Sequence, residues 1–427
     1  MRILFLTVYF PPEAGPPQAR NYEMARLFTE WGHEVTVLTA FPNHPTGVIP
    51  KEYRGKLFAR ETMDGMRVLR TTLYPAPNRG FWRWSAKHLS FSVTSLMASP
   101  LAGGYDIIVV GSASLFLGLT AHAISLYKRV PWVFTVADLW PATAVAQGRL
   151  SNPTLIRLAR GLASAVYNRA GAVVAVSQAM CEEVVRNGVP EGRVFHIPNG
   201  TDTNLFHPQA DGGWLRNELG LRDRFVVMYA GSMGPAHGLT VIVEAAKLLR
   251  DDPVVRFVMA GDGSVKQDLV EMAAREGADN ISWVGRQPQT RMPEVFNAAD
   301  VVIVPQRKSE FFAGVVPFKT AEAMACARPI IMASPPGEAT TMLEAAGAGL
   351  VIEPESPRAL AEAILKIKDQ PEEAAEMGRR GRLYSVENLD RAKLAKRFEQ
   401  VLLDLVSTKK KGRRGPASEK HATRVAS

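Results

Sequence analysis

The sequence predicts an α/β protein made of two doubly wound, parallel-sheet domains in tandem. Three observations lead to this fold class. Short apolar, strand-like runs alternate with amphipathic helical stretches along almost the whole chain, which is typical of parallel α/β architecture. The chain has 427 residues, more than one hydrophobic core ordinarily holds. A turn-rich segment, PNGTDTNLFHP at residues 198–208, separates two such series.

The first series begins at the N-terminus. Its first apolar run is short and stops at two prolines with no small-residue cleavage site, so it predicts a buried strand and not a signal peptide. A helix is predicted at residues 19–30. The strands predicted in this half are 2–8, 33–39, 107–110, 132–137, 172–176 and 194–197. Those predicted in the second half are 225–230, 255–260, 281–284, 301–304 and 329–333.

These patterns predict four parts of the chain. A first Rossmann-like domain spans 1–205 and a second spans 206–387. A final helix at 388–407 is expected to pack back towards the first domain, and residues 408–427 to form a disordered basic tail. Open parallel sheets bind ligands beyond the carboxyl ends of their strands. We therefore expect the two sheets to face each other across a cleft that holds the ligand.

The distribution of charge argues against a nucleic-acid-binding protein. The net charge is +9, but the tail from residue 408 holds seven basic residues and one acidic residue, so the body is nearly neutral. The tail is either a solvated terminus or a segment attracted to an anionic membrane surface. The two cysteines lie far apart, which fits a reducing cytoplasm. With no run of about 18 apolar residues, no segment is expected to span a bilayer.

Motifs for metal ions and common cofactors are missing from the sequence. It contains no D-x-D and no His/Cys cluster with metal-ligand spacing, so no metal is expected. The first strand leads into YFPPEAGPPQAR, which has one glycine, Gly15, and lacks the dinucleotide fingerprint G-x-G-x-x-G. Locally, Gly15 is interpreted as a simple turn. No cofactor is expected.

The stretch GVVPFKTAEAMACARPII at 314–331 suggests an anion site. A helix is predicted to begin near Pro317, which places Lys319 in its first turn, where the helix dipole disfavours a cation. An anion held against the loop that contains Val315 and Val316 would remove this conflict. Glu322, one turn further on, could accept hydrogen bonds from ribose hydroxyls. Together they describe a nucleoside diphosphate site; the alternative is a surface salt bridge between Lys319 and Glu322.

Three other loops follow predicted strands. VMYAGSMGPAHGL places Gly231 between a strand and a helix, where bare backbone amides can hold phosphate oxygens, and adds His237 as a hydrogen-bond donor. Gly285 ends another strand, where the backbone can approach a flat ligand closely. Asp138 follows the strand WVFTVA; it either faces the ligand site or caps a helix that starts near Pro141, and local sequence favours the cap.

Taken together, these stretches resemble the retaining glycosyltransferases of family 4, which have the GT-B fold. The resemblance runs from ILFLTVYFPPEAG to EAMACARPII and includes Asp138-Leu139-Trp140-Pro141 and Pro317-x-Lys319-x-x-Glu322. It is most similar to bacterial members that build surface polysaccharides such as O-antigen. It implies a metal-independent hexosyltransferase whose second domain holds a nucleotide sugar, with UDP as the expected nucleotide, and whose first domain holds the acceptor.

The resemblance also assigns roles to residues. Glu322 matches the ribose-binding glutamate, and Asp138 matches a position that contacts the donor sugar near the reacting carbon. Gly15 matches one of two glycines near the diphosphate, and Gly285 falls where the backbone helps to recognise the base. Same-face attack, with the enzyme stabilising the departing diphosphate, is the implied mechanism. Asp138 and Lys319 are the expected catalytic residues.

The sequence departs from the family at the diphosphate. The usual Arg and Lys there align with Ser232 and His237, and the first glutamate of the E-x7-E pair aligns with Gly314. We expect Lys319, backbone amides and His237 to replace the missing cations.

The acceptor side is suggested by residues 78–97, which mix basic residues with aromatic ones. They are Arg79, Arg83, Lys87, Phe81, Trp82 and Trp84. This composition fits either a helix lying in a membrane interface or an ordinary helix packed on the sheet. In the first case the acceptor is a sugar on a polyprenyl diphosphate at the inner face of the cell membrane. Residues 78–97 and the basic tail would then make the peripheral membrane contact of a cytoplasmic protein.

Two alternatives to a transferase stay open at this point. One is a UDP-sugar 2-epimerase of the same fold, which binds the same donor and needs no acceptor. The other is a non-catalytic nucleotide-sugar-binding subunit of a membrane complex, which the replaced Arg/Lys pair favours.

Overall fold

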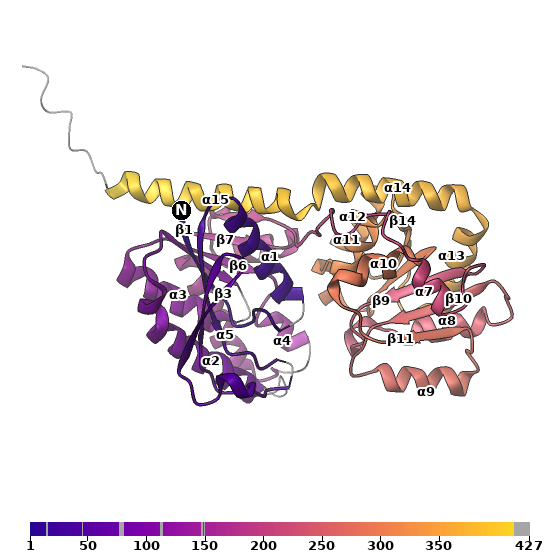
Figure 1. Cartoon of the computed structure of the whole chain (residues 1–427), viewed down its shortest axis with the longest axis horizontal. Helices are drawn as coiled ribbons and strands as arrows, with labels where there is room; N and C mark the ends of the chain where they lie inside the picture. Colours follow the sequence, from indigo (N-terminus) through magenta and orange to yellow (C-terminus); the bar gives the residue numbers. More distant parts are fainter. Residues whose placement is uncertain are drawn as a thin grey trace, which may run out of the picture. The chain divides into compact units, whose positions relative to one another are not determined.

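The computed structural model describes residues 1–413 except 14–15, 45, 77–80, 112–113, 147 and 149. It divides into two compact units (Figure 1). The first unit comprises Met1–Ile197 and the chain from Ala395 onward, and the second comprises Pro198–Leu394. The chain therefore leaves the first unit before the boundary expected at residue 205, and it returns through its last helix.

An eight-stranded sheet forms the centre of the first unit, in the order β3-β4-β2-β1-β5-β6-β7-β8. All neighbouring strands are parallel except β3 and β4. The strands are β1 (Arg2–Leu6), β2 (Glu34–Ala40), β3 (Phe58–Met63), β4 (Met66–Thr71), β5 (Ile107–Gly111), β6 (Trp132–Val136), β7 (Ala172–Ala175) and β8 (Val194–His196).

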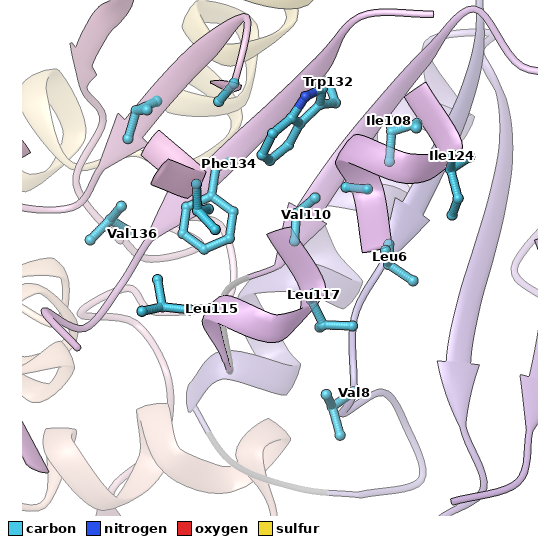
Figure 2. Packing of buried hydrophobic residues seen from close by; sticks show 14 of the residues in the cluster. Leu6, Val8, Ile108, Val110, Leu115, Leu117, Ile124, Trp132, Phe134 and Val136 are labelled. Atoms are coloured by element: carbon cyan, nitrogen blue, oxygen red, sulfur yellow. The ribbon is translucent and has the colours of Figure 1, made fainter. Parts of the chain in front are cut away.

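Helices cover both faces of this sheet. They are α1 (Pro16–Glu30), α2 (Phe81–Ala98), α3 (Leu115–Lys128), α4 (Ala142–Ala146), α5 (Pro153–Arg169), α6 (Gln178–Arg186) and most of α15 (Arg391–Arg413), with short 3₁₀ turns η1 (Lys51–Tyr53), η2 (Ser99–Ala102) and η3 (Glu191–Arg193). On one face, alternate residues of β1, β5 and β6 pack against α3 (Figure 2). On the other, Phe28 of α1 contacts Phe5 and Phe398.

The sequence pattern missed the hairpin of β3 and β4. Its outer strand, FARETM, alternates exposed and half-buried residues and lacks a continuous apolar run. The signal that could have found it is the tight turn between the strands, where Asp64 and Gly65 both have positive φ angles of 48° and 78°. An Asp-Gly pair between two short runs is a hairpin signal.

The second unit has a six-stranded, fully parallel sheet in the order β11-β10-β9-β12-β13-β14. Its strands are β9 (Phe225–Ala230), β10 (Val255–Ala260), β11 (Ile281–Val284), β12 (Val301–Pro305), β13 (Ile330–Ala333) and β14 (Gly349–Ile352), of which only β14 was not predicted. The helices are α7 (Gly213–Glu218), α8 (Thr240–Leu248), α9 (Lys266–Glu276), α10 (Met292–Asn297), α11 (Phe318–Ala325), α12 (Glu338–Ala346), α13 (Pro357–Asp369) and α14 (Pro371–Asn388), with 3₁₀ turns η4 (Pro235–His237), η5 (Gln289–Arg291) and η6 (Glu310–Gly314). Both domains are thus the predicted doubly wound, largely parallel sheets.

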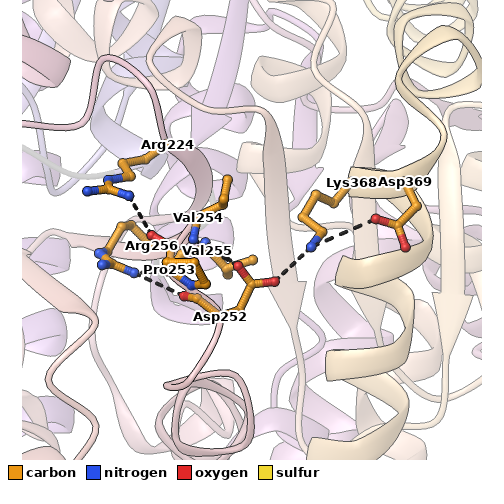
Figure 3. A network of polar contacts seen from close by, with 8 residues as sticks. All are labelled: Arg224, Asp252, Pro253, Val254, Val255, Arg256, Lys368 and Asp369. Carbon is orange, nitrogen blue, oxygen red and sulfur yellow. Dashed lines mark hydrogen bonds and ion pairs between the residues drawn. The ribbon is translucent and has the colours of Figure 1, made fainter.

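A polar network anchors the loop before β10 to α13 (Figure 3). Asp252 accepts a 2.7 Å hydrogen bond from Lys368 and two backbone hydrogen bonds from Val254 and Val255. The bond from Lys368 is the main reason that the pKa of Asp252 lies below its ordinary value. The network therefore fixes the edge of the domain away from the carboxyl ends of the strands.

The last helix, α15, is longer than predicted. It continues to Arg413, so residues 408–413, expected to be disordered, are helical. From Ala395 onward it belongs to the first unit. Glu399 accepts hydrogen bonds from His33 at 2.6 Å and from Lys396 at 2.9 Å. Burial alone would raise the pKa of Glu399, but these two partners outweigh it and the pKa ends below its ordinary value.

Helix α2 is both packed and apolar on its outer side. Lys87, which the sequence placed in an interfacial face, is 1% exposed and lies over the Tyr9 ring, and Trp84 stacks on Trp140. Those two expectations were wrong, because both side chains point into the unit. Arg79 lies outside the described residues, and so does the side chain of Phe81. The exposed apolar residues of α2 are Trp82, Leu89, Val93, Leu96 and Met97.

Within the described ranges, no helix combines the length and hydrophobicity needed to cross a bilayer. Both cysteines, Cys181 and Cys326, are free and buried, one in each unit. Across the same ranges, no cluster of three His, Cys, Asp or Glu side chains could hold a metal ion.

Candidate functional site

The candidate site of the second unit lies at the switch point of its sheet. The first and fourth strands of this unit, β9 and β12, are neighbours, and the strand order reverses between them. In an open α/β sheet, ligands bind outside the carboxyl ends of the strands at this point. The segments that leave β9 and β12 there are the glycine-rich loop from Gly231 to Gly238 and the chain from Gln306 to α11. Most residues singled out in the sequence fall on these two segments.

Close packing of two loops explains the glycines after β9. Gly231 and Gly261 have φ angles of 142° and 143°, which side chains rarely adopt. A Cβ atom on Gly261 would lie 1.9 Å from the Gly231 carbonyl oxygen. The amide of Gly231 donates to Ala260 at 2.9 Å, and the amide of Met233 donates to Asp262 at 2.9 Å. The loop is therefore held tightly on its neighbour.

Lys319 reaches from α11 to this loop. Its Nζ atom lies 3.7 Å from the centroid of the Tyr229 ring and 2.8 Å from where a Cβ of Gly231 would be. The atom is buried and has no hydrogen-bond partner in the described part of the chain. Burial lowers the pKa of Lys319 to about 7, against the opposing charge of Glu322. A buried ammonium with three unused donors is a receptor for an anion.

The start of α11 reinforces this preference. Pro317 is the N-cap and provides no side-chain hydrogen bond. The first N–H groups of the helix thus have no capping side chain, and the positive end of the helix dipole lies beside Lys319. The residues around Lys319 are buried as predicted, namely Thr320, Ala321, Ala323, Met324 and Ala325.

Glu322 is half-buried and accepts a 3.3 Å hydrogen bond from Gln289. Burial raises the pKa of Glu322 to about 7, although Gln289 and Lys319 act in the opposite direction. No ion pair joins Glu322 to Lys319, because the lysine bends towards Tyr229. The alternative of a surface salt bridge between them is therefore wrong. A carboxylate oxygen beside an amide donor can still accept hydrogen bonds from a diol.

His237 and Ser232 flank the glycine-rich loop. Burial, aided by the charge of Lys319, lowers the pKa of His237 to about 4, so the ring is neutral near pH 7. It can donate or accept a hydrogen bond there but does not replace a cation. Ser232 is exposed, and its carbonyl accepts a 2.6 Å hydrogen bond from the Tyr229 hydroxyl. Lys319 is thus the cation that this loop and α11 share.

The segment before α11 is partly occupied by its own hydrogen bonds. The amide of Val315 donates to Phe312 at 3.0 Å, so this N–H is not free for a ligand. Val316 is half-buried and packs against the core. Gln306 accepts a 2.6 Å hydrogen bond from Ser334 and holds this segment to β13.

Gly285 lies at the exposed end of the edge strand β11. A Cβ atom there would meet nothing within 4 Å, so the space beside this backbone is open. The chain then turns towards α11, where Gln289 reaches Glu322. An open backbone edge near that carboxylate can accommodate a flat ring.

Asp138 belongs to the first unit. It is exposed at the carboxyl end of β6 and accepts a hydrogen bond from the Thr143 hydroxyl in the first turn of α4. Trp140, two residues on, stacks on Trp84 of α2 with ring centroids 5.4 Å apart. The structure thus brings Gly231, Ser232, His237, Lys319 and Glu322 together in the second unit and places Asp138 in the other one. Gly15 lies outside the described residues.

Two residues of this site were missed in the sequence. Tyr229 lies inside the apolar run FVVMYA and has no local signal apart from its hydroxyl. Gln289 lies in a polar loop with many equivalent neighbours. Only the pairing of strands and the packing of α11 brings both to Lys319 and Glu322.

Comparison with known proteins gives consistent likenesses. Residues 16–200 match the family model "Glycosyl transferase 4-like domain", and residues 215–384 match "Glycosyl transferases group 1". The chain is 27% identical over 378 residues to the putative colanic acid biosynthesis glycosyl transferase WcaI of Escherichia coli K12, covering 85% of this chain and 91% of that one. It is 24% identical over 381 residues to the putative teichuronic acid biosynthesis glycosyltransferase TuaC of Bacillus subtilis 168, covering 87% and 90%.

Solved structures share the fold. Anabaena HepE in complex with UDP superposes with a TM-score of 0.71 at 20% identity, covering 95% of this chain and all of that one. Sucrose-phosphate synthase from Thermosynechococcus elongatus gives a TM-score of 0.73 at 20% identity, covering 96% and 100%.

Proposed function

The chain belongs to the group 1 glycosyltransferases, the retaining and metal-independent family 4 with the GT-B fold, and on that premise we propose that it transfers a sugar from a UDP-sugar to a lipid-linked glycan during surface polysaccharide synthesis. The observation that carries the proposal is the Lys319 ammonium, buried without an acceptor at the start of α11. A diphosphate placed there would accept its N–H bonds and lie at the positive end of the helix dipole.

The remaining donor contacts follow from this position. Glu322, one turn along α11, accepts hydrogen bonds from the ribose, assisted by Gln289. The glycine-rich loop at Gly231 leaves room for phosphate oxygens, and the neutral His237 donates one hydrogen bond. The open backbone at Gly285 receives the base. UDP as the nucleotide is supported by the likeness to HepE, whose structures are described with UDP and with UDP-glucose.

In the proposed reaction the acceptor hydroxyl attacks the anomeric carbon on the face that the diphosphate leaves. The bond to the β-phosphate oxygen breaks, a bond to the acceptor oxygen forms, and the hydroxyl proton passes to the departing diphosphate. Lys319 and the N-terminus of α11 stabilise the charge that develops on this leaving group. Asp138 contacts the donor sugar near the reacting carbon.

A lipid-linked acceptor at the inner face of the membrane is supported by the outer surface of α2 and α3. Trp82, Val93 and Met97 are 71%, 53% and 75% exposed on α2, and Leu126 and Tyr127 of α3 are 66% and 71% exposed. The two helices pack on each other. Exposed apolar side chains of this number suit partial insertion into an interface. Surface polysaccharide synthesis is supported by the named roles of WcaI and TuaC.

Calorimetric titration of UDP without added metal tests the donor site. The comparison is between the wild type, Lys319→Ala and Glu322→Ala, with Lys308→Ala as the matched control, because Lys308 is an exposed lysine paired with Glu353. We expect each of the first two substitutions to weaken binding about tenfold or more, as for a lost charge-assisted hydrogen bond. Equal binding in all four proteins would overturn the proposed site.

Asp138→Ala separates transfer from the two alternatives. A transferase should lose turnover while keeping UDP affinity, since Asp138 lies in the first unit and the UDP contacts proposed above lie in the second. A non-catalytic subunit would show no transfer to membrane extracts in any variant. A 2-epimerase would convert the donor sugar without an acceptor.

A further inference from the structure

Arg20 is a buried charge without a counter-charge. The residue is 5% exposed, and its Nη2 atom is inaccessible and has no hydrogen-bond partner. Its guanidinium makes no hydrogen bond or ion pair anywhere in the described ranges. Burial lowers the pKa of Arg20 to about 10, so the group is still protonated at pH 7. Proteins rarely retain such a charge unless something pairs with it.

The other buried arginines of the described chain are satisfied. Arg70, 1% exposed, donates to Glu61 and to two backbone carbonyls. Arg391, 6% exposed, donates to the carbonyls of Asn199 and Gly200. The fold thus pairs a buried guanidinium where the partner belongs to the chain. Arg20 differs, which points to a partner that is not part of it.

Arg20 lies beside the switch point of the first sheet. The next residue, Asn21, donates a 3.0 Å hydrogen bond to Thr7, just beyond the end of β1. A Cβ atom on Gly111, at the end of β5, would lie 2.5 Å from the Asn21 amide nitrogen, so glycine is needed there. Strands β1 and β5 are neighbours at which the strand order reverses. This start of α1 is therefore where a doubly wound sheet binds its ligand.

The direction of the side chain and the start of the helix agree with an anion. Side chains of a helix lean towards its N-terminus, so Arg20 extends back towards the first turn of α1 and the positive end of its dipole. That turn opens with Pro16 and Pro17, which carry no N–H. The helix start alone thus offers few donors, and a guanidinium supplies up to five.

We propose that Arg20 and the N-terminus of α1 form a phosphate-binding site in the first unit, separate in sequence from Lys319. The ligand is a phosphate ester or diphosphate. It comes either from the diphosphate of the sugar donor or from the diphosphate of a lipid-linked acceptor. The choice between these sources rests on the proposed transferase function, whereas the phosphate site does not.

Arg20→Met tests the site, with Arg26→Met as the matched control. Arg26 is on the same helix and forms a surface ion pair with Glu30. In the ligand-free protein, Arg20→Met should raise the melting temperature, because it removes an uncompensated buried charge, while Arg26→Met should change it little. A merely structural arginine would give a lower melting temperature on substitution, and that result would contradict the proposal.

Titration with UDP and with farnesyl diphosphate identifies the source of the phosphate. Arg20→Met should weaken one of the two by about tenfold or more, as for a lost charge-assisted hydrogen bond. A loss for UDP assigns the donor, and a loss for farnesyl diphosphate assigns the acceptor. Unchanged affinity for both ligands would overturn the site.

Arg20→Lys covers the case in which Arg20→Met does not fold. Lysine keeps the charge but not the planar fork, so affinity for the same ligand should fall several-fold without being lost. Wild-type affinity of this variant for both ligands would overturn the proposal. The Lys319 titration described above fails or succeeds independently, because that lysine belongs to the second unit.

Discussion

The Lys319 ammonium lies 3.7 Å from the centroid of the Tyr229 ring, and the hydroxyl of the same tyrosine donates a 2.6 Å hydrogen bond to the Ser232 carbonyl. Tyr229 therefore joins α11 to the glycine-rich loop. A desolvated cation–π contact contributes about 2 kcal/mol, and it uses the face of the ring without occupying the N–H donors of the lysine. The ammonium is held in place and left available for an anion.

Replacement of Tyr229 should separate these two roles. Tyr229→Phe keeps the ring under Lys319 but frees the Ser232 carbonyl, so UDP affinity should fall only a few-fold and stability by about 1 kcal/mol. Tyr229→Leu removes both contacts and should lower affinity about tenfold. Urea unfolding and calorimetry measure the two effects. Tyr105→Phe is the control for stability, since the Tyr105 hydroxyl is buried without a partner; equal losses in all three variants would contradict this account.

Donor binding should depend on pH through Lys319. The pKa of this lysine is about 7 in the free protein, and a diphosphate binds its protonated form. Affinity for UDP-glucose, whose diphosphate does not titrate near neutrality, should therefore fall roughly tenfold between pH 7 and pH 8.5. Glu322 and His237 also lie near the lysine, so Lys319→Arg, which stays charged, provides the reference profile. A profile of the same steepness in both proteins would assign the titration to another group.

The same pKa shift gives the opposite trend for ligand-free stability. Between about pH 7 and pH 10 the unfolded chain binds a proton at residue 319 that the folded chain has released, so the free energy of unfolding should rise with pH over this range. Lys319→Arg should lack the rise. The difference between the two denaturant titrations, each repeated across the range, isolates the contribution of this group.

Two glycine substitutions should have different consequences. Gly261→Ala brings a Cβ atom to 1.9 Å from the Gly231 carbonyl at a φ angle of 143°, so both the melting temperature and UDP affinity should fall. Gly285→Ala adds a methyl group where nothing lies within 4 Å, so the melting temperature should not change. If Gly285 receives the base, this methyl group should still weaken UDP binding. Unchanged UDP affinity in Gly285→Ala would remove Gly285 from the site.

Membrane association should depend on the outer face of α2. The double substitution Val93→Glu and Met97→Glu puts charges on two exposed apolar positions and should reduce co-sedimentation with vesicles of phosphatidylethanolamine and phosphatidylglycerol several-fold. Leu248→Glu is the matched control, a 52% exposed leucine on the second unit. Equal sedimentation of the two variants and the wild type would show that α2 does not meet lipid.

Local patterns predicted most of the fold. The apolar runs of the buried parallel strands are continuous, as expected for strands covered on both faces, and all of those predicted are present, whereas the polar outer strand β3 was missed. In the same way, the cation in the first turn of α11 and the carboxylate one turn later were visible in the sequence, because their spacing along a helix is fixed by its geometry.

The sequence by itself determined two doubly wound domains and the pair Lys319 and Glu322 on one helix. Only the tertiary structure decided that Lys319 lies on Tyr229 and not on Glu322, that Lys87 and Trp84 point inward, and that Arg20 is buried without a partner. The physical reason is that periodicity reports the face of an element on which a residue lies. Whether a long side chain on that face finds a partner depends on strands and loops that are distant in the chain, and no local pattern records it.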